Sequence, residues 1–481
     1  MEKRFWSKMV IPFVATLAFG CQGNRQAQET SAQLPNIIYI LADDLGYGDL
    51  SCLGQQNYQT PNIDRLAAKG MLFTQHYAGS TVCAPSRCSL MTGLHTGHTL
   101  VRGNKEVEPE GQWPIPDSAY TLAEMLKKAG YITGAFGKWG LGFPGSEGDP
   151  NLQGFDQFFG YNCQRKAHNY YPEYLWDNQK KLFLEGNTGD HFVDYAPEII
   201  HRKALDFIDS NKDEPFFLFY PNVIPHAELI APEENMSLFR NKFNPELSYK
   251  GVDSGPGFRD GSYCSQPESH TAFVAMVDIL DKQVGEIVSK LKELGLEENT
   301  IIMFTSDNGP HKEGGADPDY FDSNGPLRGY KRDLYEGGIR VPMIVSWPGI
   351  IAPGSKTDHI SAFWDVMPTL AEIAGCNALG GLDGISFLPV LTGQDGQKQH
   401  KSLYWEFHEL GGRQAVRMGD WKLVCYNVLR EEEKTIELYN LKTDVGEKLN
   451  VAGFNPEIVQ KMIVMLQKSR TDSELFQFEQ Q

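Results

Sequence analysis

The sequence has too little positive charge for a typical nucleic-acid-binding protein. Its 44 lysines and arginines are outnumbered by 62 aspartates and glutamates, which gives a formal net charge of -18. Proteins that bind nucleic acid need a basic surface to displace the counterions of the phosphates. The charge balance therefore argues against nucleic acid as a partner, but it is compatible with a small anionic substrate where Lys, Arg and a metal ion reverse the local field.

The sequence also lacks a hydrophobic run long enough to span a bilayer, and it has no C-x-x-C pair. The apolar run MVIPFVATLAF follows basic residues and ends shortly before Gly20 and Cys21. Such a layout is typical of an export signal, and the ending AFGC resembles a bacterial lipoprotein signal in which Cys21 would be acylated. The alternative is an ordinary cleaved signal with an incidental cysteine. The remaining cysteines indicate neither a zinc knuckle nor a disulfide framework.

The length of 481 residues and the hydrophobic fraction of 41% indicate a folded protein of more than one small domain. We expect a signal peptide at residues 1–21, a polar tether at 22–34, a catalytic domain at 35–390 and a C-terminal subdomain at 391–481. The signal predicts an exported protein, either periplasmic or anchored in the outer membrane of a bacterium, whose only contact with a membrane is a lipid at its N-terminus.

Short apolar runs that end in polar or charged residues recur along the chain. They are PNIIYILADD, YITGAFGKWG, FFLFYPNVIPH, TIIMFTSDNG and VPMIVSWPG. Each is typical of a buried parallel strand whose carboxyl end opens onto a site. Between them, a capping box at Thr121 and Glu124 predicts a helix that stops at Gly130, and an apolar stripe predicts a long helix over about 268–295. The pattern predicts an α/β fold with a large, mostly parallel sheet between helices.

After about residue 390 the pattern changes to short runs joined by turns. SLYWEFHE, RQAVRMGDWKLVCY and TIELYNL are typical of antiparallel strands, and a helical segment follows from Pro456 to about Ser469. We expect a small antiparallel sheet with a terminal helix.

Oxygen-bearing side chains follow two of the predicted parallel strands. Asp43 and Asp44 end the first strand, and Asp307 and Asn308 end a later one. Four oxygen donors suit a hard cation such as calcium, whereas zinc usually takes more histidine or thiolate. Turn and capping roles would explain either pair alone, but two pairs at matching places favour a metal site.

Basic side chains are candidates for binding an anion at the same edge. Lys138 directly follows a predicted strand, and Arg87 and Lys331 are further candidates, because a cation there would stabilise negative oxygens. His226 lies just beyond another strand and is a candidate general acid, with His311 a weaker one. The alternative is that these lysines are ordinary solvated charges.

Cys83 permits several interpretations. Pro85 suits the first turn of a helix that would end at Gly93, which places Cys83 near a helix N-terminus, where a thiol pKa is lowered. A reactive thiol paired with a histidine is therefore permitted, as are a disulfide partner, a packing residue and the precursor of a modified residue. A reactive thiol would leave the metal ligands and lysines unexplained.

The run CAPSR followed by LMTG resembles the C-x-P-S-R…L-x-T-G signature of type I sulfatases. ADDLGYGD, TPNIDRLAAKG, GKWGLG, SDNG and YEGGIRVP occur in the family's order, and the resemblance covers most of residues 36–450. It is closest to bacterial sulfatases of galactose and N-acetylgalactosamine. It implies an alkaline-phosphatase-like fold, and it implies that a formylglycine-generating enzyme oxidises Cys83 to Cα-formylglycine.

The resemblance also implies a role for each candidate. The calcium ligands would be Asp43, Asp44, Asp307 and Asn308. Arg87 would orient the hydrated aldehyde, Lys138 and Lys331 would hold sulfate oxygens, and His226 would protonate the departing sugar oxygen. One aldehyde hydroxyl would attack the sulfur, and loss of the proton from the other would expel sulfate.

One position departs from the family's pattern. Many members read G-K-W-H-x-G and give the histidine a role at the formylglycine hydroxyl, but this sequence has Gly140 there. His168 and His311 are the candidates to replace it. Substrate binding is expected in the loop 164–178, where Arg165, Lys166 and His168 would bind sugar hydroxyls or a neighbouring carboxylate. Aromatic rings of the loop would stack on a sugar or simply pack the loop.

Arg102 and Asn104 in VRGN form a second candidate substrate-binding segment. Together these features predict a sulfatase that acts on the end of a glycan, at the 6-O or 4-O position of galactose or N-acetylgalactosamine. Two alternatives are a phosphatase or phosphonate hydrolase on the same fold, and a glycan-binding lipoprotein with a vestigial site. The two-zinc phosphatases use a Ser or Thr nucleophile and more histidine ligands, and only Gly140 supports a vestigial site.

Overall fold

The computed structural model describes residues 34–108, 111–378 and 380–478, together with 1, 2, 6 and 8. The predicted signal peptide and most of the polar tether, including Cys21, lie outside the described residues and stay predictions. Leu34–Gln481 form one compact unit, and the predicted division at residue 390 also stays a prediction. Among the described helices, none has the length and apolar character needed to cross a membrane.

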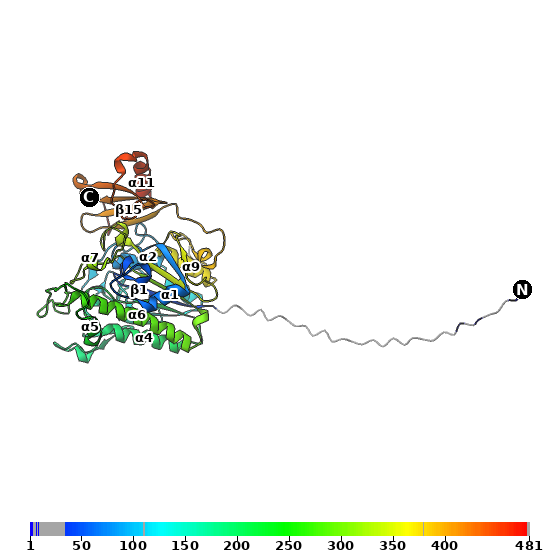
Figure 1. Cartoon of the computed structure of the whole chain (residues 1–481), viewed down its shortest axis with the longest axis horizontal. Helices are drawn as coiled ribbons and strands as arrows, with labels where there is room; N and C mark the ends of the chain where they lie inside the picture. Colours follow the sequence, from blue (N-terminus) through cyan, green and yellow to red (C-terminus); the bar gives the residue numbers. More distant parts are fainter. Residues whose placement is uncertain (3–5, 7, 9–33, 109–110, 379, 479–481) are drawn as a thin grey trace. The chain divides into compact units, whose positions relative to one another are not determined.

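Eleven of the described strands form one mixed sheet (Figure 1). They are β1 (Asn36–Ala42), β2 (Met71–Tyr77), β5 (Ile132–Lys138), β6 (Gln157–Tyr161), β7 (Tyr174–Asp177), β8 (Lys180–Phe183), β9 (Phe216–Pro221), β10 (Thr300–Ser306), β11 (Arg340–Ser346), β12 (Ser355–Thr357) and β13 (Ser361–Ala362). Their order is β12-β2-β11-β10-β1-β9-β5-β6-β7-β8, and β13 pairs with β2. Strands β10, β1, β9, β5 and β6 are parallel neighbours. A separate pair is formed by β3 (Glu106–Val107) and β4 (Gly111–Gln112).

Helices cover both faces of the large sheet. On one face lie α1 (Pro61–Lys69), α4 (Ala196–Ser210), α5 (Glu233–Phe239) and α6 (Ser269–Glu293), and on the other α2 (Cys83–Thr92), α3 (Leu122–Lys128), α9 (Val366–Ile373) and α10 (Leu388–Thr392). Alternate side chains of a strand point to opposite faces, so Ile38 of β1 packs in the first core and Ile37 in the second. Burial of each such side chain contributes about 1.5–3 kcal/mol. The short helices α7 (Pro318–Phe321) and α8 (Glu336–Ile339) lie in the connection between β10 and β11.

The structure confirms most of the predicted elements of the large sheet. The Thr121 side chain accepts a hydrogen bond from the Glu124 amide in the predicted capping box of α3, and the predicted long helix is α6. One expectation was wrong, because β11 runs antiparallel to β10. The connection between them starts and ends at the carboxyl edge of β10, so β11 enters the sheet from that edge and its own carboxyl end lies at the opposite one.

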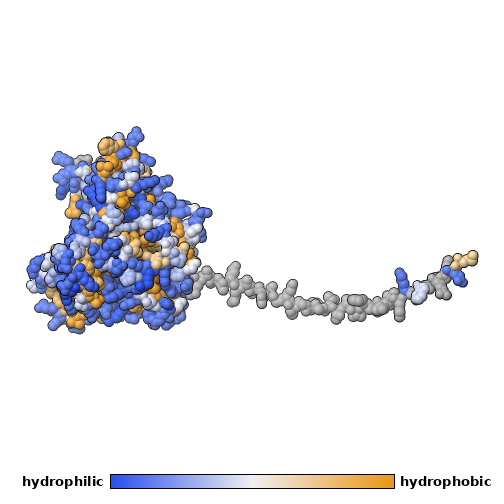
Figure 2. Space-filling model, in the orientation of Figure 1, coloured by the Kyte–Doolittle hydropathy of each residue, from blue (hydrophilic) through white to orange (hydrophobic). Residues whose placement is uncertain are grey.

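The predicted C-terminal sheet and helix are also present. Strands β14 (Leu403–Phe407), β15 (Arg413–Met418), β16 (Trp421–Tyr426) and β17 (Thr435–Asn440) form an antiparallel sheet, and α11 (Pro456–Lys468) contacts β15 and β16. The sheet packs on the rest of the unit through Trp405, whose Nε1 donates to the Ala78 carbonyl at 2.9 Å. The face seen in Figure 2 is mostly hydrophilic.

Candidate active site

The carboxyl ends of β1 and β10 bring the four predicted metal ligands together. Ala42 pairs with Ser306 at the end of the two parallel strands, so each acidic pair follows at the same edge. The Asp44 amide donates to Asp307 Oδ1 at 3.1 Å, and Asn308 Nδ2 donates to Asp44 Oδ1 at 2.6 Å. All four side chains, including that of Asp43, are buried.

This donor set fits a calcium ion. Asn308 Oδ1 is buried and has no hydrogen-bond partner among the described residues, and such orphaned buried atoms are rare in folded proteins. Three carboxylates and one amide oxygen make the all-oxygen set that calcium prefers. A cation here would satisfy Asn308 Oδ1 and offset the crowded carboxylate charges.

Each of the three carboxylates also has its own buried cation. The pairs are Asp43 with Lys138 at 2.6 Å, Asp44 with Lys331 at 2.9 Å and Asp307 with Arg87 at 2.8 Å. Burial alone raises the pKa of Asp43, but the Lys138 charge and the other nearby cations outweigh it and hold that pKa well below its usual range. Burial alone lowers the pKa of Lys138, but Asp43 raises it above its usual value. Asp43 and Lys138 are therefore a charged pair, whereas burial and the Asp43 charge raise the pKa of Asp307 to about 7 despite Arg87.

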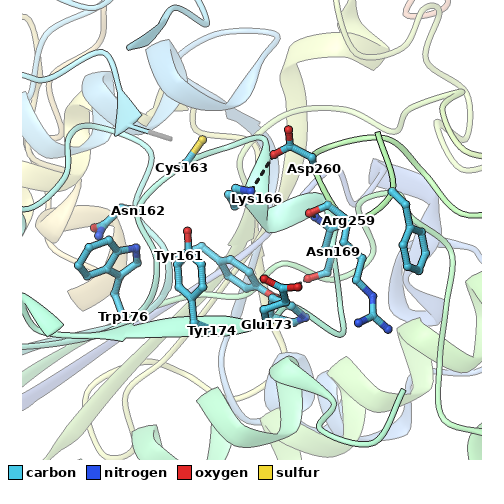
Figure 3. A pocket seen from close by; sticks show the side chains of 12 residues that line it. Tyr161, Asn162, Cys163, Lys166, Asn169, Glu173, Tyr174, Trp176, Arg259 and Asp260 are labelled. Carbon is cyan, nitrogen blue, oxygen red and sulfur yellow. Dashed lines mark hydrogen bonds and ion pairs between the residues drawn. The ribbon is translucent and has the colours of Figure 1, made fainter. Parts of the chain in front are cut away.

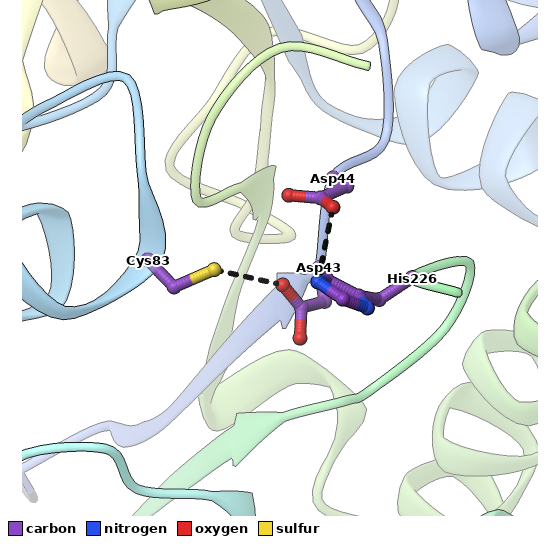
Figure 4. Close-up of side chains that lie close together, drawn as sticks. All are labelled: Asp43, Asp44, Cys83 and His226. Carbon is purple, nitrogen blue, oxygen red and sulfur yellow. Dashed lines mark hydrogen bonds and ion pairs between the residues drawn. The ribbon is translucent and has the colours of Figure 1, made fainter. Parts of the chain in front are cut away.

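Cys83 is the first residue of α2 and is buried beside this cluster (Figure 4). Its Sγ lies 3.5 Å from both Asp43 Oδ1 and Lys138 Nζ. Arg87 is one turn further along the same helix, and residues four apart share a helix face, so the C-x-P-S-R spacing directs both side chains to one place. The helix ends at Gly93, as predicted, with a φ of 67°. Burial raises the pKa of the Cys83 thiol well above its usual value, which disfavours the reactive-thiolate interpretation.

His226 lies in the loop after β9 and belongs to the same cluster (Figure 4). Its Nδ1 faces the Ala227 carbonyl oxygen, so we assign the proton of the neutral ring to Nδ1. Its Nε2 lies 3.0 Å from Lys331 Nζ and 3.4 Å from Asp44 Oδ2. Burial and the Lys331 charge lower the pKa of His226 well below its usual value. In this arrangement Nε2 accepts a hydrogen bond from the lysine.

Two other histidines stack on His226. The ring centroids of His168 and His311 lie 4.8 Å and 5.4 Å from that of His226, with interplanar angles of 13° and 16°. His168 Nδ1 donates to the Gly261 carbonyl at 2.8 Å. The structure thus places both predicted histidines beside His226, and it gives neither a contact with Cys83.

Arg102 forms an ion pair with Glu406. It is buried, and its Nη1 donates to Glu406 Oε1 at 2.9 Å and to the Thr471 carbonyl at 3.0 Å. Its Nε donates to the Thr99 carbonyl. These contacts join β14 to the segment after α2, and the predicted substrate contact of Arg102 stays a prediction. The sequence pattern did not reveal this partner, which is more than 300 residues away.

The other two candidate substrate residues also have protein partners. Asn104 is exposed, and its Oδ1 accepts a hydrogen bond from the Ala84 amide in the first turn of α2. Arg165 lies 3.5 Å from Glu106 in an ion pair. Asn104 therefore supports the helix that carries Cys83, and Arg165 fastens its loop to β3.

The aromatic residues of the loop 164–178 divide into two groups. Tyr170 and Tyr171 are buried, and Tyr170 donates a hydrogen bond to the Val223 carbonyl at 2.7 Å, so these two rings pack the loop. Tyr174 and Trp176 line a cavity of about 220 Å³ (Figure 3).

Sequence reasoning missed Glu313, which lies at the same cluster. Its Oε2 is 3.4 Å from Lys331 Nζ and 3.9 Å from His226 Nε2, and Tyr263 donates a hydrogen bond to it at 3.1 Å. Glu313 lies in the irregular segment after β10, where no periodic pattern marks it. The only sequence feature that pointed to Glu313 was its position six residues after Asp307.

Comparisons with known proteins agree with this geometry. Residues 35–376 match the Sulfatase family, and residues 329–473 match N-sulphoglucosamine sulphohydrolase, C-terminal. The N-acetylgalactosamine-6-sulfatase of Mus musculus is 32% identical, over 88% of this chain and 77% of the relative. The N-acetylgalactosamine-6-O-sulfatase of Bacteroides thetaiotaomicron is 31% identical, over 96% and 98%.

A solved structure shows the same architecture. The crystal structure of Ps i-CgsB in complex with k-i-k-neocarrahexaose has a TM-score of 0.75 and 30% identity, over 91% of this chain and 92% of that one. The predicted alkaline-phosphatase-like fold is confirmed. Because the Sulfatase match covers more than half of the chain, this protein belongs to the sulfatase family and is a sulfuric ester hydrolase.

Proposed function

We propose that this protein is a calcium-dependent and formylglycine-dependent O-sulfatase that removes sulfate from terminal galactose or N-acetylgalactosamine, at the 6-O or 4-O position. One observation carries the proposal. Cys83 Sγ lies 3.5 Å from both Asp43 Oδ1 and Lys138 Nζ, so the residue that we expect to be oxidised adjoins a candidate metal ligand and a candidate sulfate-binding cation. The named substrates of the two N-acetylgalactosamine-6-sulfatase relatives support the choice of sugar.

Two groups made or bound by the protein supply part of the chemistry. Formylglycine made from Cys83 would supply a hydrated aldehyde whose hydroxyl attacks the sulfur. Calcium held by the three aspartates and Asn308 would offset the negative charge of the sulfate.

The chain's own cations hold the sulfate against nearby carboxylates. Two negative groups about 4 Å apart repel each other by about 4 kcal/mol at an effective dielectric constant of about 20. Lys138 and Lys331 therefore both offset the aspartates and bind sulfate oxygens. Arg87, fixed on Asp307 by two hydrogen bonds, orients the reacting group of residue 83 from the same helix face.

His226 would deliver the proton that the departing sugar oxygen needs. Its Nε2 is the ring nitrogen that lies in the cluster, and it already contacts the Lys331 ammonium at 3.0 Å. Because Nε2 is unprotonated in the neutral ring, the Lys331 ammonium would supply the proton through Nε2, and the pair would regain it from water. We therefore assign the general-acid role to the pair.

The cavity in Figure 3 is the candidate site for a sugar ring near the reaction centre. Trp176 and Tyr174 offer aromatic faces, on which sugar rings stack. The side chain of Asn162 also lines the cavity and is buried. Its Nδ2 and Oδ1 have no hydrogen-bond partner in the described ranges. Lys166 and Asn169, on either side of His168, belong to the same lining, which connects the cavity to the histidine that stacks on His226.

The N-terminal sequence supports an envelope location. We propose that Cys21 is acylated and anchors an exported enzyme in the periplasm or on the outer membrane, where sulfated glycans reach it. Labelling with palmitate that is lost in Cys21→Ser would support the anchor, whereas equal labelling of both proteins would contradict it.

The proposed function is tested by mass spectrometry across Cys83 after coexpression with a formylglycine-generating enzyme. We expect the aldehyde at residue 83 and sulfate release from 6-O- or 4-O-sulfated galactose or N-acetylgalactosamine, with the 3-O esters as the comparison. An unmodified thiol together with no release from any of these esters would overturn the proposal. Cys83→Ser should abolish turnover in a host that cannot oxidise serine.

A further inference from the structure

The backbone of Gly140 leaves a space beside the reaction centre that another side chain fills. Gly140 comes two residues after Lys138 and has a φ of 79°, which L side chains rarely adopt. A Cβ at this position would lie 2.0 Å from Gln164 Nε2 and 3.7 Å from Arg87 Cδ. The Gln164 carboxamide therefore lies directly on the Gly140 backbone and close to Arg87.

The polar atoms of Gln164 have no partner in the protein. The residue is 5% exposed, and neither Nε2 nor Oε1 makes a hydrogen bond to any residue that the structure describes. The loop holds it in place, because its backbone amide donates to Gln112 Oε1 at 3.2 Å. A buried amide is normally paired, so the unpaired carboxamide indicates a missing ligand.

Its surroundings point to an anion as that ligand. Arg87, next to Gln164, is paired with Asp307, and Lys138 is paired with Asp43. The carboxamide adds an uncharged donor to a site whose other donors are charged and fixed. A neutral amide also cannot remove a proton, so its contribution is to hold and orient a bound group.

We propose that Gln164 is a substrate-contacting residue whose Nε2–H donates a hydrogen bond to an oxygen of the sulfate ester beside Arg87. This inference rests on the proposed sulfatase function and assigns one residue of the predicted substrate loop 164–178 that sequence reasoning did not single out. It also gives the space over Gly140 an occupant other than His168 or His311. The glycine is required because any side chain there would displace Gln164.

The first test measures binding without turnover. Inorganic sulfate is titrated by calorimetry into the full-length Cys83→Ser protein with calcium present, with and without Gln164→Leu. We expect the dissociation constant for sulfate to rise about tenfold with Gln164→Leu, because one donor is lost. A change of less than twofold would overturn the inference. Gln153→Leu is the matched control, since Gln153 is also buried but its Nε2 donates to the Glu147 carbonyl.

The second test uses charge to separate contact from packing. Gln164→Glu keeps the size of the side chain, so its fold should persist, but an ionised carboxylate beside the sulfate would repel it. We expect kcat/KM of the oxidised enzyme to fall more than tenfold at pH 8 and to recover partly at pH 5, relative to the same ratio for wild type. A pH-independent loss equal to that of Gln164→Leu would overturn the contact and leave only a packing role.

The two proposals fail in different ways. If the protein binds sulfate in a way that depends on Gln164 but releases no sulfate from any ester, the proposed function is contradicted and the Gln164 contact is supported. If Gln164→Leu and Gln164→Glu both turn over substrate as fast as wild type, only the Gln164 contact is contradicted.

Discussion

At the scale of single residues, the site is defined by buried atoms that lack a protein partner. Asn308 Oδ1 and the Gln164 carboxamide are both buried and unpaired among the described residues, in a cluster whose charged groups are otherwise matched. Desolvated groups without partners are unfavourable in a folded protein. Gln164 lies outside the sequence motifs, and only the structure shows that its carboxamide is buried without a partner beside Gly140.

Removal of calcium should therefore destabilise the protein through Asn308. Saturation with calcium at about 100 times its dissociation constant adds about 2.7 kcal/mol to the free energy of unfolding, and EGTA should remove that gain. Asn308→Ala should weaken calcium binding at least tenfold and shrink the calcium-induced shift in melting temperature. Asn187→Ala is the control, because that buried amide is fully hydrogen-bonded elsewhere and should lose stability but keep the shift. Equal calcium shifts in all three proteins would contradict the assignment.

Asp49 should make stability fall as the pH rises. Burial and the charge of Asp322 raise the pKa of Asp49 to about 7, although the Gly46 amide and Tyr58 hydroxyl donate to it. The unfolded value is about 3.9, so the folded state binds this proton more tightly. The contribution of this Asp49 proton to the free energy of unfolding is complete below about pH 4 and is lost as the pH rises to about 7. Its upper limit is about 4 kcal/mol, at 1.36 kcal/mol per pKa unit.

Urea unfolding of wild type and Asp49→Asn at pH 5 and pH 8 measures this contribution. We expect wild type to lose more free energy of unfolding between the two pH values than the variant does. Asp395→Asn, at an exposed position, should follow wild type. If the free energies of unfolding of wild type and Asp49→Asn differ by the same amount at pH 5 and pH 8, the raised pKa of Asp49 is ruled out.

At the scale of elements, the sequence predicted the positions of the strand ends better than the directions of the strands. The acids after β1 and β10 and the lysine that ends β5 were assigned to one edge because parallel strands end together, and the pairing of Ala42 with Ser306 shows that edge. The direction of β11 was missed because an apolar run looks the same in either orientation. The Glu406 partner of Arg102 was not predicted because that contact depends on how the small sheet docks, which no local pattern encodes.

The close approach of β5 to its neighbours should control the position of Lys138. Gly137 has a φ of 140°, and a Cβ there would lie 2.0 Å from the Pro221 carbonyl oxygen of β9. Gly137→Ala should therefore lower the free energy of unfolding by about 1–3 kcal/mol and reduce kcat/KM more than tenfold by moving Lys138. Gly130→Ala has a comparable strained φ but meets no atom within 4 Å, so it should cost stability without affecting turnover. Identical behaviour of the two variants would contradict this account.

At the scale of the whole molecule, buried charges join the small sheet to the sheet that carries the site. Lys422 of β16 is fully buried, and its Nζ lies 2.9 Å from Glu336 Oε1 and 3.0 Å from Glu447 Oε1. Glu336 begins α8, directly before β11, so the contact spans the two sheets. Because a buried charge that loses its partner is strongly unfavourable, the two sheets should unfold together.

Lys422→Met tests this coupling. The variant leaves two buried carboxylates without their shared cation, so we expect the free energy of unfolding to fall by about 3–5 kcal/mol in urea. Adding Glu447→Gln should restore part of the loss, because Glu336 keeps its ion pair with Arg340 at 3.3 Å and Glu447 is the carboxylate left without a cation. Lys398→Met, at an exposed position, should change stability by less than about 0.5 kcal/mol. Wild type should show a single transition by tryptophan fluorescence and circular dichroism, and an early separate transition of the small sheet would show that the coupling is absent.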